Sequence, residues 1–326
     1  MYPARFAYLK ADSFPAASAA LTTGGAGAKV LAGGQTLIPM LKLRLLKPEL
    51  IIDLGGITDA DDIARNEQAI EIGALARHAQ IGRSEALREF PIISDCALGI
   101  ADAQVRNMGT IGGSLAEADP CSCWPALLVA LDGEVLLEGP EGRRGMKVRD
   151  LLADAYTPNL AVGELITRVA VSRASLEGIG AFVAFKRAAP AYPTASCALQ
   201  VAFEGDRIAS VRVGLGCLGL TPLAFDQANA MATGRALTRA LIHEIAHAVS
   251  EFVEPIEDNK GSEAYKRSLA RGLVIRAWRG EGAGHGQGAS VDGPAESRSR
   301  QTRRSENRRH RRGGGQDRAG DLFRLV

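Results

Sequence analysis

The sequence predicts an α+β fold, because strands and helices are segregated along its second half. Three segments there have strand character, at 182–186, 196–203 and 208–214. Glu204-Gly205-Asp206, between the last two, is typical of a tight hairpin turn. Two helical segments follow, at about 237–252 and 263–278. Strands followed by helices favour an α+β arrangement over a doubly wound parallel sheet.

The first half contains shorter elements separated by glycine- or proline-containing turns. Residues 29–31 form a short apolar strand that runs into Gly33-Gly34, and Pro39 lies near the start of a short helix. Residues 69–73 alternate like a strand, and Gly139-Pro140-Glu141-Gly142 joins the two strands of a hairpin. Strands are expected at 29–31, 50–54, 69–73, 133–137, 146–148 and 164–171, and helices at 14–21, 36–46, 78–88, 91–103 and 124–131.

Composition narrows the class of protein. The chain has 326 residues, 46% apolar and 23% charged, which fits a soluble globular protein of two domains. Aromatic residues make up 5%, too few for an aromatic platform that binds nucleic acid. The sequence has no apolar run of about 18 residues and no N-terminal signal pattern, so we expect a cytoplasmic protein without a membrane span. We expect the domains to be 1–175 and 176–279, with a disordered tail at 280–326.

The cysteines and the tail indicate no further chemistry. Five cysteines, at 96, 121, 123, 197 and 217, are too few for a disulfide framework, and Cys121-x-Cys123 lacks the second pair of a metal site. From Arg279 onward eleven arginines face six acidic residues, a net +5, so the rest of the chain carries −3 of the total of +2. Such a tail can bind nucleic acid through charge alone. We nevertheless expect no nucleic-acid partner.

Two glycine-rich turns have the composition of phosphate-binding loops. Ala32-Gly33-Gly34-Gln35-Thr36 follows a strand, and Gly109-Thr110-Ile111-Gly112-Gly113-Ser114 lies about 76 residues further on. Because glycine has no Cβ and adopts positive φ, several backbone N–H groups can approach a pyrophosphate at such a turn. Two turns could clasp a dinucleotide from both sides. Glycine pairs also mark ordinary turns, and the chain has 37 glycines, so spacing alone leaves both interpretations open.

Longer motifs around the turns resemble a known family. Leu-Ala-Gly-Gly-Gln-Thr-Leu-Ile-Pro at 31–39, Ile-Gly-Ala-Leu-Ala-Arg-His-Ala at 72–79 and the segment 104–116 occur in this order, followed by Ala118-Asp119-Pro120. Together they resemble the FAD-binding medium subunit of molybdenum hydroxylases, the family of xanthine dehydrogenase and carbon monoxide dehydrogenase. Three later segments agree, so the resemblance covers about residues 1–278. These segments are Phe185-Lys186-Arg187, Gly214-Leu215-Gly216 and Ser-Glu-Ala-Tyr-Lys-Arg at 262–267.

The resemblance implies a fold and a set of cofactor-binding residues. The fold would be an FAD-binding domain of the p-cresol methylhydroxylase (PCMH) type, with two α+β lobes, followed by a smaller α+β C-terminal domain like that of the carbon monoxide dehydrogenase flavoprotein. Both turns would wrap the pyrophosphate and ribityl chain, Asp119 would contact the ribityl or adenosine side, and Lys186 would lie near the flavin ring. The implied FAD-binding residues are Lys29, Val30, Leu31, Ala32, Gly33, Gly34, Gln35, Thr36, Leu37, Thr110, Ile111, Gly112, Gly113, Ser114, Ala118, Asp119 and Lys186.

The resemblance also implies partners and an electron path. A large subunit would hold a molybdenum–pterin centre and a small subunit would hold [2Fe-2S] clusters, in a heterotrimer or a dimer of heterotrimers. Electrons would pass from the clusters through FAD in this chain to NAD, oxygen or a quinone. The organic substrate would be oxidised in the large subunit, so we expect no catalytic residue for it in this chain. The sequence does not name that substrate.

Two departures from the family pattern limit the analogy. Position 123 is a cysteine where the family often has an aspartate, which puts any contact of that carboxylate to FAD in doubt. The segment after Pro120 lacks the cysteine-bearing insert that gives some relatives, the 4-hydroxybenzoyl-CoA reductases, an extra iron–sulfur cluster. FAD is therefore expected to be the only cofactor of this chain.

Two further motifs indicate other functions. His243-Glu244-Ile245-Ala246-His247 has the spacing of a zinc peptidase helix and is the alternative hypothesis, a zinc metallopeptidase. We favour the interpretation of these histidines as surface residues of an amphipathic helix. Gly214-Leu215-Gly216-Cys217-Leu218-Gly219 matches the dinucleotide pattern G-x-G-x-x-G, but Thr221-Pro222 follows where that pattern requires a helix. We therefore expect a turn at the end of a strand.

Overall fold

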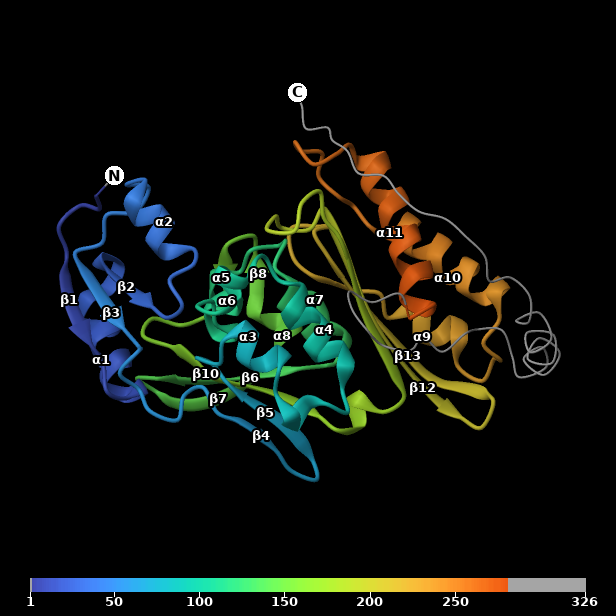
Figure 1. Ribbon diagram of the computed structural model, residues 1–326, viewed down its shortest axis with the longest axis horizontal. Helices are drawn as coiled ribbons and strands as arrows, with labels where there is room; N and C mark the ends of the chain where they lie inside the picture. Colours follow the sequence, from blue (N-terminus) through green and yellow to red (C-terminus); the bar gives the residue numbers. More distant parts are fainter. Residues whose placement is uncertain (1, 281–326) are drawn as a thin grey trace, which may run out of the picture. The chain divides into compact units, whose positions relative to one another are not determined.

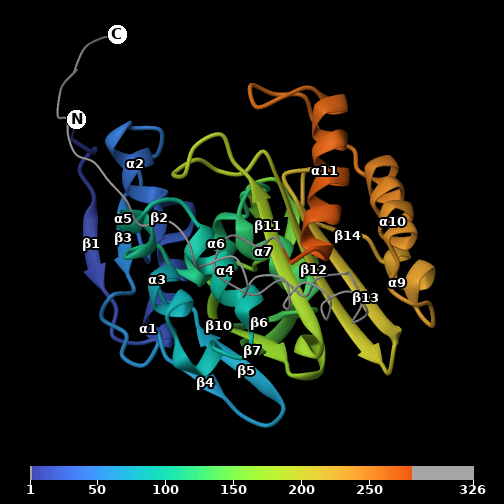
Figure 2. The same ribbon diagram turned by 45° about the vertical axis from the view of Figure 1, so that its right-hand side comes forward.

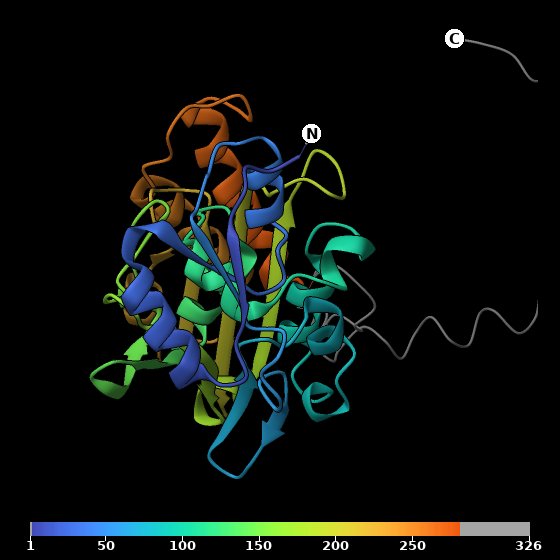
Figure 3. The same cartoon turned by 90° about the vertical axis from the view of Figure 1, so that its left-hand side faces the viewer.

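The structure, a computed structural model, describes residues 2–280. Its N-terminal part contains a small parallel sheet. Strands β1 (Ala7–Lys10), β3 (Leu50–Asp53) and β2 (Ala28–Leu31) pair in that order, with helix α1 (Phe14–Gly24) packed beside them (Figure 3). Helix α1 begins at Ser13, whose side chain accepts a hydrogen bond from the N–H of Ala16. The sheet and α1 share a small core of their own, which includes Ala17, Ile52 and Leu54.

The second sheet is antiparallel and holds the largest core. Its strand order is β4-β5-β10-β6-β7, and helices lie over it (Figure 1). The strands are β4 (Ile63–Arg65), β5 (Ala69–Gly73), β6 (Glu134–Gly139), β7 (Gly142–Lys147) and β10 (Leu165–Ser172). The helices are α3 (His78–Gly82), α4 (Pro91–Gly99), α5 (Ala103–Arg106), α6 (Ile111–Glu117) and α7 (Cys123–Ala130). Shorter elements complete this part: α2 (Leu37–Lys42), α8 (Val148–Leu151), β8 (Leu152–Asp154) and β9 (Thr157–Pro158).

The third sheet is an antiparallel meander covered by helices on one face. Its order is β11-β12-β13-β14, and Figure 2 shows α9, α10 and α11 along it. The strands are β11 (Ile179–Phe185), β12 (Ala195–Glu204), β13 (Arg207–Gly216) and β14 (Leu223–Ala224), and the helices are α9 (Gln227–Ala232), α10 (Arg239–Phe252) and α11 (Glu263–Trp278). In α10, Leu241, Ile245 and Val249 recur every four residues and are fully buried against the sheet.

Helix α7 links the second and third sheets. All eight of its residues are buried, and most of its side chains, Trp124 and Leu127 among them, belong to the core of the second sheet. On its other side α7 packs directly on β13, because Gly214 has no side chain. A Cβ at Gly214 would lie 2.1 Å from the carbonyl oxygen of Ala126 in α7. The close helix–strand contact therefore depends on a glycine in the strand.

Most elements expected from the sequence occur in the structure. The third-sheet strands, the hairpin of β6 and β7, and helices α10 and α11 confirm the α+β prediction. The predicted elements do not include β1 or α6. Helix α6 begins at Ile111, inside the glycine-rich turn at 109–114, where no helix is predicted. No helix among residues 2–280 is long and apolar enough to cross a membrane. The tail predicted to be disordered lies outside the described residues.

Candidate functional site

The two glycine turns lie against each other. A Cβ at Gly33 would lie 2.3 Å from the carbonyl oxygen of Met108 and 2.7 Å from the Cα of Gly109, so only glycine permits this contact. On the same side, a Cβ at Gly113 would lie 3.8 Å from the Cβ of Ala32. The structure thus brings together two turns that are far apart in the sequence.

The first turn has unpaired backbone donors. It connects β2 to α2, and Gly34 adopts a positive φ of 70°. Among the hydrogen bonds of residues 2–280, none is donated by the backbone N–H of Gly33, Gly34, Gln35 or Thr36. The side chain of Gln35 instead donates to the carbonyl of Gly33 over 3.1 Å. Neighbouring N–H groups without partners are the arrangement that binds an anion such as a phosphate.

The second turn is bonded internally. The N–H of Ile111 donates to Ala76 over 3.1 Å and that of Gly112 donates to Ala74 over 2.9 Å. Thr110 caps helix α6: its side chain accepts from the N–H of Gly113 over 3.1 Å, and its carbonyl accepts from Ser114. These four N–H groups are therefore used within the protein.

The glycines of the second turn also differ in their surroundings. Gly112 is buried, and a Cβ there would lie 2.6 Å from the Cβ of Ala74. It therefore permits close packing on the strand end at Ala74. Gly113, in contrast, is exposed and lies on the side of the first turn. A Cβ at Gly113 would lie 2.9 Å from the Thr110 Oγ1, so this glycine also leaves room for the cap of α6.

The buried residue His78 packs against the second turn. The N–H of His78 donates to the carbonyl of Gly109 over 3.0 Å, and its Nδ1 accepts from the indole N–H of Trp124 over 3.1 Å. Burial, with a smaller effect of the nearby Arg106 charge, lowers the pKa of His78 to about 4. The imidazole is therefore neutral near pH 7, with its proton on Nε2. Sequence reasoning missed His78 because its partner Trp124 lies far along the chain.

Asp119 lies where α6 ends. Ala118, with a φ of 53°, closes the helix and is fully buried, so its side chain cannot contact a ligand. Asp119 is also buried, and its Oδ1 accepts from the N–H of Cys121 over 2.8 Å. The carboxylate is held at a fixed position, and the N–H of Tyr156 donates to the neighbouring carbonyl of Ala118 over 2.8 Å.

Tyr192 connects Asp119 with the first turn and was not predicted. It lies close to Thr36 of the first turn. Desolvation, followed by the charges of Asp119 and Glu117, raises the pKa of Tyr192 to about 12. Half of the residue's surface is exposed. The loop between β11 and β12 thereby reaches the glycine turns.

Other predicted residues lie further from the contact of the turns. Lys29, Val30 and Leu31 form strand β2, where Lys29 is exposed and Val30 packs on the small N-terminal core. Leu37 is the first residue of α2. Lys186 follows β11 and its ammonium donates to the carbonyl of Gly99 at the end of α4. The contacts of Lys186 thus do not connect it to either turn.

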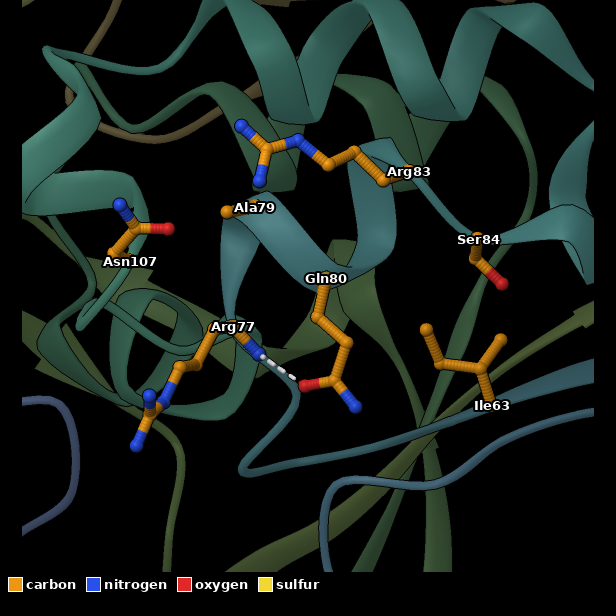
Figure 4. Close-up of a pocket in the computed structure, with 7 residues that line it drawn as sticks. All are labelled: Ile63, Arg77, Ala79, Gln80, Arg83, Ser84 and Asn107. Atoms are coloured by element: carbon orange, nitrogen blue, oxygen red, sulfur yellow. Dashed lines mark hydrogen bonds between the residues drawn. The ribbon is translucent and has the colours of Figure 1, made fainter.

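A pocket opens beside the second turn. It has a volume of about 670 Å³, and its wall includes Arg77, whose backbone pairs with Thr110. Figure 4 shows the side chains of Arg77, Arg83 and Asn107 on one side of the pocket, and Gln80, Ser84 and Ile63 on the other. Within residues 2–280 neither arginine forms an ion pair, so this region carries unneutralised positive charge.

The two alternative motifs have ordinary surroundings. In α10, His247 and Glu244 are exposed, and the Glu244 carboxylate pairs with Arg235 over 3.0 Å, which occupies the group a zinc peptidase needs as a base. Among the described residues, no group of three or more potential ligands could hold a metal ion. Residues 214–219 form the end of β13 and a turn, and no helix begins there.

These features define a flavin-binding domain with an attached α+β domain. Residues 4–173 match the family model "FAD binding domain in molybdopterin dehydrogenase", and residues 180–280 match "CO dehydrogenase flavoprotein C-terminal domain". The chain belongs to the FAD-binding medium subunits of the molybdopterin hydroxylases, and is the flavin component of an oxidoreductase. The resemblance found in the sequence is thereby confirmed.

Several relatives match this chain over nearly their full lengths. The glyceraldehyde dehydrogenase medium chain of Sulfolobus acidocaldarius is 33% identical over 281 residues, which cover 86% of this chain and 99% of the relative. The carbon monoxide dehydrogenase medium chain of Hydrogenophaga pseudoflava is 34% identical, covering 85% and 97%. A solved carbon monoxide dehydrogenase from that organism, lacking the Mo-pyranopterin moiety, superposes with a TM-score of 0.82 at 33% identity, covering 86% of this chain and 98% of the other.

Proposed function

We propose that this chain is the flavin subunit of a heterotrimeric molybdenum hydroxylase. In this proposal it receives electrons from [2Fe-2S] clusters in a small partner subunit and passes them, through FAD, to NAD, oxygen or a quinone. A large molybdenum–pterin subunit completes the complex, as a heterotrimer or a dimer of heterotrimers in the cytoplasm. The domain boundary near residue 175 and the FAD contacts below belong to the same proposal.

The unpaired N–H groups of the first turn carry the proposal. The groups of Gly33, Gly34, Gln35 and Thr36 lie opposite a second turn that is rigidly bonded, so an anionic pyrophosphate would gain donors without breaking existing bonds. Gly113 leaves the opposite wall without a side chain. These residues fit FAD.

The remaining residues would orient the cofactor and shield it. Asp119 is fixed by the N–H of Cys121 and can accept from a ribose or ribityl hydroxyl. Tyr192 is half exposed and lies near Thr36, so its ring can cover a flat ligand. When bound, FAD supplies the redox chemistry of its isoalloxazine. The protein supplies position, hydrogen bonds and exclusion of water.

The relatives support a role that does not depend on the organic substrate. Their names refer to glyceraldehyde, carbon monoxide and caffeine, which have little chemistry in common. A subunit shared among such complexes is expected to handle electrons and not to touch the substrate. The substrate of the present complex would then be determined by the large subunit.

Flavin binding and assembly test the proposal. We expect the purified chain to bind FAD with one-to-one stoichiometry and to show the absorption spectrum of an oxidised flavin. Co-expression with a large molybdenum–pterin subunit and a small [2Fe-2S] subunit of the same family should give one co-purifying complex. Mixing the anaerobically reduced complex with NAD⁺, air-saturated buffer or a quinone then identifies the acceptor by the fastest reoxidation. A chain that neither retains FAD nor takes it up on reconstitution would disprove the proposal.

A further inference from the structure

A cluster of thiols and one lysine lies directly after Asp119. Cys121 follows Pro120, and among the five cysteines, all of them within residues 2–280, it alone is not buried. The ammonium of Lys260, from the loop before α11, lies 3.5 Å from the Cys121 sulfur. The same ammonium donates to the carbonyl of Pro193 over 3.2 Å and lies 5.9 Å from the centre of the Tyr192 ring. The Lys260 ammonium is therefore held by three neighbouring groups, one of which is the Cys121 thiol.

Cys217 is held beside Cys121 by its backbone. The N–H of Cys217 donates to the carbonyl of Pro120 over 3.0 Å, which places the two cysteines side by side. Cys217 adopts a φ of 63°, a left-handed conformation that strains a residue with a Cβ and that glycine would adopt at lower cost. The strained position thus carries a thiol adjacent to Cys121.

The electrostatics favour a thiolate at Cys121. The adjacent Cys217 thiol and the charge of Lys260, partly opposed by burial, lower the pKa of Cys121 to about 7. The charged or titratable groups that face it are Asp119, Cys123, Cys217, Lys260 and Tyr156. Asp119 opposes the thiolate and Lys260 favours it. Burial and the neighbouring Cys121 raise the pKa of Cys217, which remains a thiol.

We propose that Cys121 and Cys217 form a peroxide-sensitive dithiol site, in which Cys121 is the nucleophile, Cys217 resolves the product and Lys260 positions the thiolate. The Cys121 sulfur attacks one oxygen of a hydroperoxide, the O–O bond breaks, and the alcohol or water leaves with a proton. The sulfenic acid on Cys121 is then attacked by the Cys217 sulfur, an S–S bond forms, and water leaves. Two thiols lose two electrons, and one peroxide is reduced.

The site differs from the proposed FAD contacts but adjoins them. The peptide of Cys121 donates to Asp119, and Lys260 lies over Tyr192. A disulfide between Cys121 and Cys217 would therefore fix the segment that carries Asp119. The thiol chemistry itself does not require FAD, so a chain that failed to bind FAD would still be expected to show it.

Alkylation rates in the native full chain test the nucleophile. We expect one thiol to react fast with iodoacetamide, peptide mapping to place it at Cys121, and its rate to rise with pH with a midpoint near the pKa of about 7. Lys260→Met should raise the midpoint and slow alkylation at pH 7 by a factor of roughly 3 to 10, while Lys260→Arg should restore it. Cys197→Ser, at a buried cysteine elsewhere, is the matched control and should change nothing. A slow Cys121, or a rate insensitive to Lys260→Met, would overturn the role given to the lysine and the thiolate.

Peroxide treatment tests the pair. Hydrogen peroxide should lower the intact mass by two hydrogens and give a Cys121–Cys217 cross-linked peptide, and dithiothreitol should reverse both changes. Cys217→Ser keeps a hydroxyl donor at this position, so it should leave alkylation fast and instead accumulate sulfenic acid that dimedone traps. Wild-type protein that gains oxygen without forming this cross-link would overturn the pair. Repeating the treatment on chain with and without FAD separates this result from the test of flavin binding.

Discussion

The two glycine turns look alike in sequence, yet the structure uses their backbones in opposite ways. In the first turn the N–H groups of residues 33–36 have no partner among residues 2–280, while in the second turn the N–H groups of residues 111–114 are all bonded within the protein. The first turn can therefore donate to a ligand, and the second provides a rigid wall at a fixed distance. In both turns glycine lets the backbone approach another group closely. Only in the first turn can that group be a ligand. The following changes test that division, from the largest expected effect to the smallest.

Gly33→Ala should reduce FAD affinity most. Its Cβ would lie 2.3 Å from the carbonyl oxygen of Met108, so the turns must separate. Overpacking of this kind costs about 3 kcal/mol, equivalent to roughly 100-fold weaker binding, measured by titration of the apoprotein with FAD. Gly145→Ala is the control, since its nearest neighbour would be Leu136 at 3.9 Å. Unchanged affinity in Gly33→Ala would show that FAD does not need the turns in contact.

Gly112→Ala should act on stability first. Its Cβ would lie 2.6 Å from that of Ala74, so we expect a loss of about 2 kcal/mol and a Tm lower by roughly 5 °C, measured by calorimetry of the apoprotein. FAD binding by the folded fraction should weaken less than in Gly33→Ala. A variant with normal Tm that had lost FAD would break the comparison, because it would make Gly112 a ligand contact.

His78 makes the support of the second turn pH-dependent. Its pKa is about 4 in the folded state, below the ordinary value of about 6.5, so the unfolded chain binds more protons between these pH values. The contribution of His78 to the free energy of unfolding is therefore fully present above about pH 6.5. It falls by about 2 kcal/mol when the pH is lowered from 7 to 5. Urea unfolding at both pH values measures the change, and His78→Gln should be less stable at pH 7 but lose this part of the slope. An unchanged slope in the variant would contradict the assignment.

Gln35→Ala should have the smallest effect. The exposed side chain donates only to the carbonyl of Gly33 within its own turn, so its removal should weaken FAD binding by about 0.5 kcal/mol, or roughly twofold. Titration with FAD at one salt concentration measures this. A loss as large as that in Gly33→Ala would mean that Gln35 contacts the cofactor itself.

The sequence allowed prediction of the elements with regular apolar patterns and of the turns, but not of their internal bonding. Strand β1 was missed because all four of its residues are exposed and show no alternation. Helix α6 was missed because Gly112 and Gly113 are poor helix formers, and the cap at Thr110 sets its start instead.

The sequence also does not predict which side chains from distant parts of the chain contact each other. His78 meets Trp124, and Tyr192 meets Thr36, through folding alone, and no local pattern marks either pair. Ala118 was included by position within a motif, whereas the structure shows it buried as the end of α6. The motifs identified the family because the segments that carry them lie together in the fold. They do not show the contacts between those segments.

The contact of α7 with β13 has a consequence for engineering this subunit. Because Gly214 lies against the backbone of Ala126, the C-terminal sheet is fitted to one particular helix of the flavin domain. A chimera that took residues after 175 from a relative would place a foreign strand on the native helix. Exchange of the C-terminal region between relatives should therefore succeed only when α7 and β13 are transferred as a matched pair.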